Sequence, residues 1–322
     1  MQIGLLGLGK MGKQIAEKLM MDNHQVVVWN RTPEVLDQYR LEQPHYIVNQ
    51  KLILSKSISD LRTNLLKPRV IWSMLPAGDA TETALKELME IAEPGDVVID
   101  GGNANFKDTE RRAKEFESKG IRFLGIGVSG GVHAKDNGCC LMVGGNKDAY
   151  EYITPLLDSM TKPSGIHTYF GTGGAGHFVK MVHNGIEYGM MQSFAEGFGV
   201  MAKSDYHLNL SAVGNNWQQG SIVASFLLQM VIDGLAKDPT LSTFDGIIGA
   251  NGEGKWTVEQ AKEAHLPIPV IEQSARFYHR YHAQIKSVAT HSLYTSQGSL
   301  GRPFCHIAGQ DSGARCSLGV SH

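Results

Sequence analysis

Short apolar segments rich in β-branched residues alternate with helical patterns through the first half of this chain, and this alternation restricts the fold more than any other feature. Helical periodicity is clearest over Met11–Met21 and Lys147–Met160. Strands that alternate with helices form βαβ units on a mostly parallel sheet. We therefore expect an α/β domain whose strands are Gln2–Leu6, Gln25–Trp29, Val70–Leu75, Asp96–Ile99, Arg122–Val128, Leu141–Val143 and His167–Phe170.

The pattern changes after Gly171. The segment GTGGAG, residues 171–176, predicts a hinge, and from there to about Lys286 apolar residues recur at helical spacing. We expect a domain boundary near Gly173 and a helical second half. A length of 322 residues also exceeds what one core usually holds, which favours two domains.

Composition narrows the functional classes. A net charge of −2 gives no electrostatic footprint for nucleic acid or an acidic membrane. No apolar run reaches about 18 residues and the N-terminus lacks a signal-peptide pattern, so we expect a cytoplasmic protein. The four cysteines have no metal-ligand spacing, and we expect free thiols and no metal site (Cys139, Cys140, Cys305 and Cys316).

The segment GLGKMG follows the first expected strand directly and opens a helix. Gly7 allows a tight turn, Gly9 lets the backbone approach a pyrophosphate, and Gly12 permits close packing of helix on strand. Strand before and helix after make this a dinucleotide-binding turn. We expect its residues to contact the cofactor: Gly7, Leu8, Gly9, Lys10, Met11 and Gly12.

The second expected strand ends in Asn30, Arg31 and Thr32 instead of the acidic residue that binds a ribose 2′-hydroxyl. Arg31 supplies a cation, and its neighbours supply hydrogen-bond donors, which suits a 2′-phosphate. The sequence favours NADP over NAD, although a solvated loop arginine would look the same.

Two further loops follow expected strands, where open α/β sheets bind ligands. In DGGN, Asn103 offers both a donor and an acceptor, and in VSGG the hydroxyl of Ser129 stands beside the backbone N–H groups of Gly130 and Gly131. The second combination suits a carboxylate. Either loop alone would more often be a structural turn.

A polar stripe lies within the long apolar helical segment 176–203. At about 100° per residue, Lys180, Asn184 and Glu187 fall on one face, with His183 and Tyr188 beside them. A buried charge is costly unless it is paired or used. A surface ion pair is the alternative interpretation, but the two loops favour a shared cleft.

Taken in order, these motifs and GEGKWT, residues 252–257, resemble the short-chain type of decarboxylating 6-phosphogluconate dehydrogenase. The resemblance covers about residues 1–260, and HNGIEYG with Glu187 and Tyr188 is particular to this branch of the β-hydroxyacid dehydrogenases. It implies an NADP-binding Rossmann domain at 1–173, an all-α substrate and dimerisation domain at 174–290, and a homodimer or higher homo-oligomer.

The residues fit the chemistry of oxidative decarboxylation. Lys180 can accept the substrate hydroxyl proton only if burial lowers its pKa from about 10.4 toward about 7 to 8. Once protonated, it stands beside the oxyanion that develops as CO2 leaves, and no metal is required. Glu187, two helical turns along, is the candidate acid for tautomerising the enediol, provided that it is desolvated.

The resemblance also implies binding roles. Asn103, the segment 129–131, His183 and Asn184 match positions that hold the substrate's hydroxyls and carboxylate. We further assign Tyr188 to the substrate, and Asn103 to the cofactor as well. Arg276 or Arg280 is the candidate for the substrate phosphate.

The tail departs from the family pattern. From about His291 it has no helical period and lacks the family's closing Phe-Gly-Gly-His segment, so we expect residues 291–322 to be poorly ordered. Two alternatives stay open: a β-hydroxyacid dehydrogenase acting on another small acid, and an inactive dimer that binds NADP.

Overall fold

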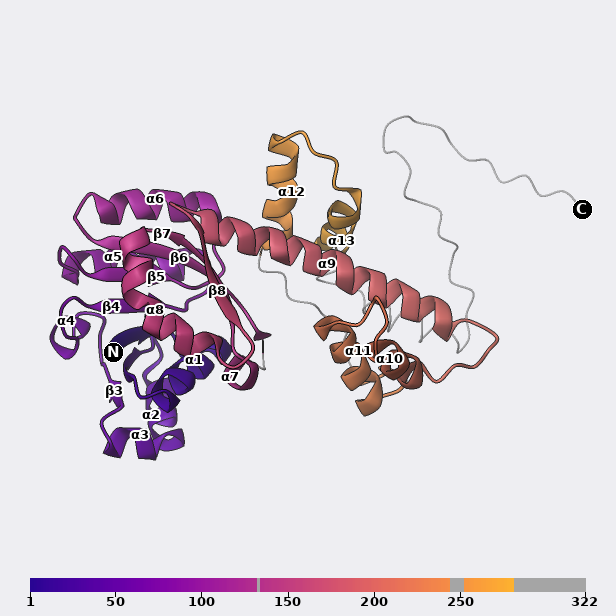
Figure 1. The fold of residues 1–322 in the computed structure, drawn as a ribbon, viewed down its shortest axis with the longest axis horizontal. Coiled ribbons are helices and arrows are strands. Elements are labelled where there is room, and N and C mark those ends of the chain that lie inside the picture. The colour runs from indigo at the N-terminus through magenta and orange to yellow at the C-terminus, as the bar shows by residue number, and fades with distance from the viewer. Residues whose placement is uncertain (132–133, 244–251, 281–322) are drawn as a thin grey trace, which may run out of the picture. The chain divides into compact units, whose positions relative to one another are not determined.

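An eight-stranded sheet organises residues 1–171 of the computed structural model (Figure 1), which describes residues 1–131, 134–243 and 252–280. The strand order is β3-β2-β1-β4-β5-β6-β7-β8. Neighbouring strands are parallel except for β6 and β7, which are antiparallel. The strands are β1 (Gln2–Leu6), β2 (Gln25–Trp29), β3 (Leu52–Leu54), β4 (Val70–Ser73), β5 (Val97–Asp100), β6 (Arg122–Ser129), β7 (Cys140–Gly145) and β8 (Ile166–Gly171).

Helices cover both faces of this sheet because successive strand residues point to opposite sides. In β1, Ile3 and Leu5 belong to one core cluster and Leu6 to the other. The first cluster includes apolar residues of α1 (Lys10–Met21) and α8 (Lys147–Thr161). The second includes those of α4 (Leu61–Asn64), α5 (Asp79–Ile91) and α6 (Phe106–Glu117). Three short helices complete this half: α2 (Pro33–Glu42), α3 (Pro44–Val48) and α7 (Ala134–Asn137).

The described residues after β8 are helical. The long helix α9 (Ala175–Ala202) is followed by α10 (Leu210–Gln218), α11 (Phe226–Lys237), α12 (Glu253–Glu263) and α13 (Pro269–Arg280). By their contacts, the described residues form two compact units, one of residues 1–194 with 252–280 and one of residues 195–243. In the second unit, Phe198 packs edge-on against Trp217 with ring centroids 5.7 Å apart.

The fold class expected from the sequence is confirmed: a Rossmann-like α/β region precedes a helical region. The sequence did not predict β3, whose three residues form the edge of the sheet, or the antiparallel pairing of β6 with β7. The limits at residues 173 and 290 stay predictions, and the tail at 291–322 lies outside the described residues.

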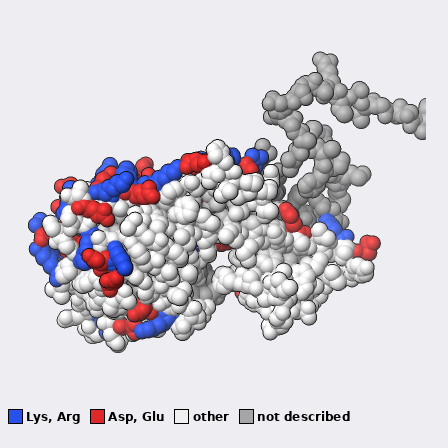
Figure 2. Space-filling view, turned by 45° about the horizontal axis from the view of Figure 1, so that its top comes forward, with Lys and Arg blue, Asp and Glu red and all other residues white. Residues whose placement is uncertain are grey.

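Two properties of the described residues concern helix hydrophobicity and surface charge. Among the described helices, none has the length and apolarity required for a membrane span. On the face drawn in Figure 2, acidic and basic side chains are interspersed, in keeping with the net charge of −2.

Candidate active site

The turn after β1 has the backbone that a dinucleotide requires. Gly7 has φ +96°, and a Cβ there would lie 2.5 Å from the carbonyl oxygen of Met74. At Gly12 a Cβ would lie 1.9 Å from the carbonyl oxygen of Gly7, so no larger residue fits. A Cβ at Gly9 would meet no atom within 4 Å. The open space beside Gly9, at the N-terminus of α1, fits a pyrophosphate.

The end of β2 is tied to this turn. Asn30 Oδ1 accepts a hydrogen bond of 3.0 Å from the Leu8 backbone N–H, and its Nδ2 donates to the Thr32 carbonyl. Asn30 therefore holds the two loops together. Arg31 and Thr32 are exposed, as are Gly9 and Lys10, while Met11 is half-buried. The guanidinium of Arg31 is accessible to a 2′-phosphate.

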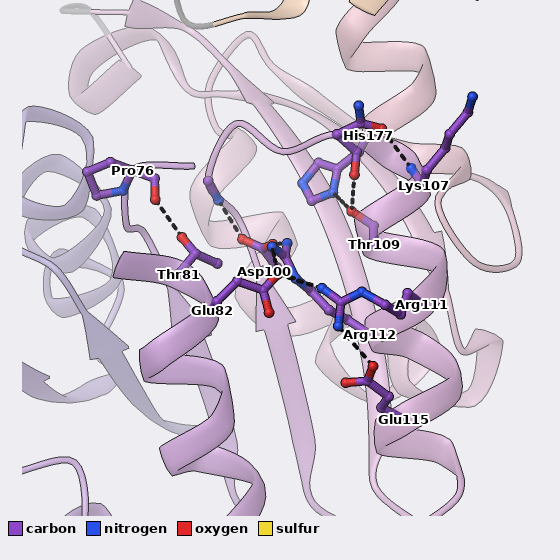
Figure 3. A network of polar contacts seen from close by, with 12 residues as sticks. Pro76, Thr81, Glu82, Asp100, Lys107, Thr109, Arg111, Arg112, Glu115 and His177 are labelled. Carbon is purple, nitrogen blue, oxygen red and sulfur yellow. Dashed lines mark hydrogen bonds and ion pairs between the residues drawn. The ribbon is translucent and has the colours of Figure 1, made fainter. Parts of the chain in front are cut away.

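A buried polar network supports the turn after β5, where the DGGN segment lies (Figure 3). Asp100 accepts from the Gly102 backbone N–H at 3.2 Å and from Arg112 Nη1 at 2.8 Å. Arg112 also pairs with Glu82 at 2.5 Å, which joins α5 and α6 to the turn. Because Asp100 is 0% exposed, its charge depends on these donors. The network fixes the start of the loop that carries the half-buried Asn103.

His177 links this turn to α9. It is 1% exposed, and its Nδ1 lies 2.7 Å from Thr109 Oγ1. Burial lowers the pKa of His177, against the opposing effect of Asp100 and the Gly102 backbone. The buried imidazole on the first turn of α9 therefore contacts both α6 and the DGGN segment.

The start of α9 lies against the sheet because glycines face each other there. A Cβ at Gly176 would come within 2.4 Å of the carbonyl oxygens of Gly125 and Met142. A Cβ at Gly127 would lie 2.3 Å from the Cβ of Lys180. Bare backbone at these positions places Lys180 directly over the C-terminal part of β6.

Lys180 is 6% exposed, and burial lowers its pKa below the ordinary 10.5. Three groups oppose that shift because they favour the charged ammonium: Glu253 on α12, Glu187 on α9 and Cys140 on β7. Desolvation is the largest effect. The burial that the sequence analysis required of Lys180 is present.

A chain of hydrogen bonds runs from α12 to the end of β6. Asn184, 8% exposed, donates from Nδ2 to Glu253 Oε2 at 2.5 Å, and its Oδ1 lies 2.8 Å from His183 Nδ1. His183 Nε2 lies 3.3 Å from Ser129 Oγ. The structure thus brings together Ser129, His183, Asn184 and Lys180, which the sequence assigned to one cleft.

The remaining residues that the sequence assigned to the site have the following surroundings. The Glu187 carboxylate lies 3.9 Å from His183 Nδ1. Its side chain is 37% exposed, so the desolvation that its acid role requires is absent in this structure. Tyr188 is 8% exposed and packs where Gly254 leaves room for its ring. Gly130 and Gly131 have φ of +153° and +55°. Arg276 is exposed and pairs with Glu272 at 2.7 Å, while the Arg280 side chain lies outside the described part.

Sequence reasoning missed Glu253 as part of the site. Its carboxylate is 2% exposed, and burial raises its pKa to about 7, with Asn184 and Lys180 opposing the shift. The segment GEGKWT was recognised as a motif, but no pattern linked a residue 69 positions away to Asn184. His177 was missed for a similar reason, since its partner Thr109 lies on α6.

Two family models match adjacent parts of the chain. Residues 2–173 match the NAD binding domain of 6-phosphogluconate dehydrogenase, and residues 176–299 match the C-terminal domain of the same enzyme.

Individual relatives agree with these models. The chain is 36% identical over 276 residues to an NAD(+)-dependent decarboxylating 6-phosphogluconate dehydrogenase of Haloferax volcanii, covering 85% of this chain and 88% of the relative. It is 37% identical over 292 residues to an NADP(+)-dependent one of Bacillus subtilis, covering 86% and 61%. The solved Plasmodium falciparum 6-phosphogluconate dehydrogenase, studied with NADP+ and with 6-phosphogluconate, superposes with a TM-score of 0.78 at 32% identity. That match covers 92% of this chain and 63% of the Plasmodium chain.

Proposed function

This chain belongs to the 6-phosphogluconate dehydrogenase family, and from that premise we propose that it oxidises and decarboxylates 6-phosphogluconate to ribulose 5-phosphate with reduction of NAD(P). The observation that carries the proposal is the buried Lys180 with its lowered pKa, held at the end of β6 beside His183, Asn184 and Ser129. The NAD(+)-dependent relative and the NADP(+)-dependent relative are 36% and 37% identical to the chain.

Lys180 provides the base for the first step. The neutral amine accepts the proton of the substrate's secondary hydroxyl as the carbon–hydrogen bond breaks. Bound NADP supplies the acceptor for that hydride. Burial favours the neutral amine, because water no longer stabilises the ammonium.

The protonated Lys180 serves the second step. The bond between the carboxylate carbon and the next carbon of the keto acid breaks, and CO2 leaves with the electron pair remaining on the sugar. The new enolate oxygen takes its proton from Lys180, which returns the amine to its neutral form. A fixed, buried ammonium stabilises the developing oxyanion with little reorganisation of water.

Glu187 is our candidate for the last step. Its carboxylic acid gives a proton to the carbon that lost CO2, which turns the enediol into the ketone. It lies one turn from His183, at 3.9 Å from Nδ1, on the face of α9 that carries Lys180. Its 37% exposure leaves the carboxyl accessible to substrate, and the bound substrate would supply the desolvation that the acid form requires.

The binding roles are proposed from the match to the family's motifs. We assign Ser129, Gly130, Gly131, Asn103, His183, Asn184, Tyr188 and Arg276 to the substrate, and residues 7–12 and 30–32, with Asn103, to the cofactor. Arg31 favours NADP because its exposed guanidinium can pair with a 2′-phosphate. A homodimer or higher homo-oligomer and a cytoplasmic location complete the proposal, to be checked by light scattering after gel filtration and by cell fractionation.

The test is a progress curve at 340 nm with 6-phosphogluconate and NADP, run in parallel with gluconate and 3-hydroxyisobutyrate. The proposal requires turnover with 6-phosphogluconate and release of one CO2 per NADPH. Reduction without CO2, or preference for an unphosphorylated acid, would instead indicate another β-hydroxyacid dehydrogenase. Binding of NADP with no turnover on any acid would indicate the inactive alternative.

A further inference from the structure

The carboxylate of Glu253 is the one buried acid that the proposed mechanism does not use among the described residues around Lys180. It is the first residue of α12, next to Gly252, which has φ +90°. Helix N-termini favour negative charge, which offsets part of the cost of burying a carboxylate. A buried acid within one hydrogen bond of a substrate-binding residue calls for an explanation.

Close packing holds α12 against α9 at this point. Thr257 Oγ1 donates to the Met181 carbonyl oxygen at 2.8 Å. A Cβ at Gly185 would lie 2.8 Å from Thr257 Cγ2, and one at Gly254 would lie 2.6 Å from the Tyr188 ring. The Glu253 side chain therefore has a fixed position relative to the polar stripe of α9.

Glu253 determines how the Asn184 amide is turned. Above its raised pKa of about 7 the Glu253 carboxylate is ionised and only accepts hydrogen bonds, so Asn184 must present Nδ2 to it, at 2.5 Å. Its Oδ1 is then left for His183, whose Nδ1 must carry a proton to donate across 2.8 Å. In the neutral imidazole Nε2 is then the acceptor, and it faces the hydroxyl of Ser129 at 3.3 Å.

We infer that Glu253 is a positioning residue for the reaction: through Asn184 it fixes the tautomer of His183, and through its charge it sets the proton affinity of Lys180. The inference rests on the proposed function. The groups that face Lys180 are Glu253, Glu187 and Cys140, and of the two acids Glu253 is the buried one. Solvent therefore screens the charge of Glu253 less than that of Glu187.

Two substitutions separate the two roles. Glu253→Gln removes the charge but keeps an oxygen that can accept from Asn184. Without the carboxylate the ammonium of Lys180 loses a stabilising neighbour, so the acid limb of the kcat/KM profile should move to lower pH by on the order of 1 unit. Glu253→Asp keeps the charge but withdraws it from Asn184. Its acid limb should stay in place while KM for 6-phosphogluconate rises on the order of tenfold, as for loss of an aligned polar contact.

A second measurement requires no turnover. Proteins labelled with 15N-histidine report imidazole tautomers by NMR, and His183→Gln identifies the signal of His183. The Nδ1–H tautomer is expected in wild type and in Glu253→Gln, with loss of that single tautomer in Glu253→Asp. Glu263→Gln is the matched control, because Glu263 ends the same helix in an exposed pair with Lys107 and the charge change is the same.

The outcomes are distinct. An unmoved acid limb in Glu253→Gln, or an unchanged His183 tautomer in Glu253→Asp, overturns the inference, as does an equal response of Glu263→Gln. If wild type does not oxidise 6-phosphogluconate, the proposed function fails, but the tautomer comparison still decides whether Glu253 orients Asn184 and His183.

Discussion

Gly127→Ala tests whether the bare backbone of β6 is what places Lys180. An added Cβ at Gly127 would stand 2.3 Å from the Cβ of Lys180 and 2.8 Å from its Cγ. Ordinary contact begins at 3.4 Å, so the two residues must separate by about 1.1 Å. The atoms that have to move include the Cβ of Lys180 in the second turn of α9, which cannot rotate away.

A shift of about 1 Å in a catalytic group costs on the order of 100-fold in rate. We expect kcat with 6-phosphogluconate to fall by that factor, whereas the affinity for NADP, measured by fluorescence titration, should be unchanged. Overpacking should also lower the free energy of unfolding in urea by about 1 to 3 kcal/mol.

Gly4→Ala is the matched control in the same sheet. Its Cβ would lie 2.9 Å from Leu65 Cδ1, the far end of a flexible side chain that can move. This variant should keep turnover near the wild-type value. A Gly127→Ala enzyme whose kcat stays within threefold of wild type would refute the claim that this contact positions Lys180.

Three other predictions concern separate parts of the molecule. Arg31→Ala should weaken NADP binding by about 2 kcal/mol, the loss expected for a charge-assisted contact, with NAD little changed; equal losses in titrations with both cofactors would show that Arg31 does not contact the 2′-phosphate. Arg112→Met should lower the free energy of unfolding by about 3 to 5 kcal/mol, because it leaves the fully buried Asp100 unpaired, and a loss below about 1 kcal/mol in urea would contradict the network's role. Burial raises the pKa of Glu253 from 4.5 to about 7. The stability that this group contributes is therefore fully present below pH 4.5 and is lost as pH rises through about 7. Relative to wild type, Glu253→Gln should accordingly gain up to about 3 kcal/mol of unfolding free energy over that interval, and parallel pH profiles for the two proteins would count against it.

Much of the fold followed from local patterns. Strands β1 and β2 begin and end where the sequence predicts, because both are continuous apolar runs bounded by a glycine turn or polar residues. Helix α9 also begins and ends within one residue of the expected range. The edge strand β3 escaped prediction because three residues carry too little periodicity to distinguish a strand from a loop.

The candidate site was predictable only along α9 and at the turns. Lys180 and Asn184 share a face at helical spacing, and that spacing alone placed them together. Glu253 and His177 depend on what packs against α9. Glycines 127 and 176 let α9 approach the sheet, and glycines 185 and 254 let α12 approach α9, across long sequence separations. No local pattern in the chain records such contacts.

The central claim is that the amine of Lys180 is the base for oxidation, and Lys180→Met tests it most directly. The methionine has a similar length and apolar character but no ionisable group. We predict that a progress curve at 340 nm with 6-phosphogluconate and NADP shows no reduction above background, while titration of NADP gives the wild-type affinity. A variant that keeps a tenth of wild-type turnover would contradict the assignment.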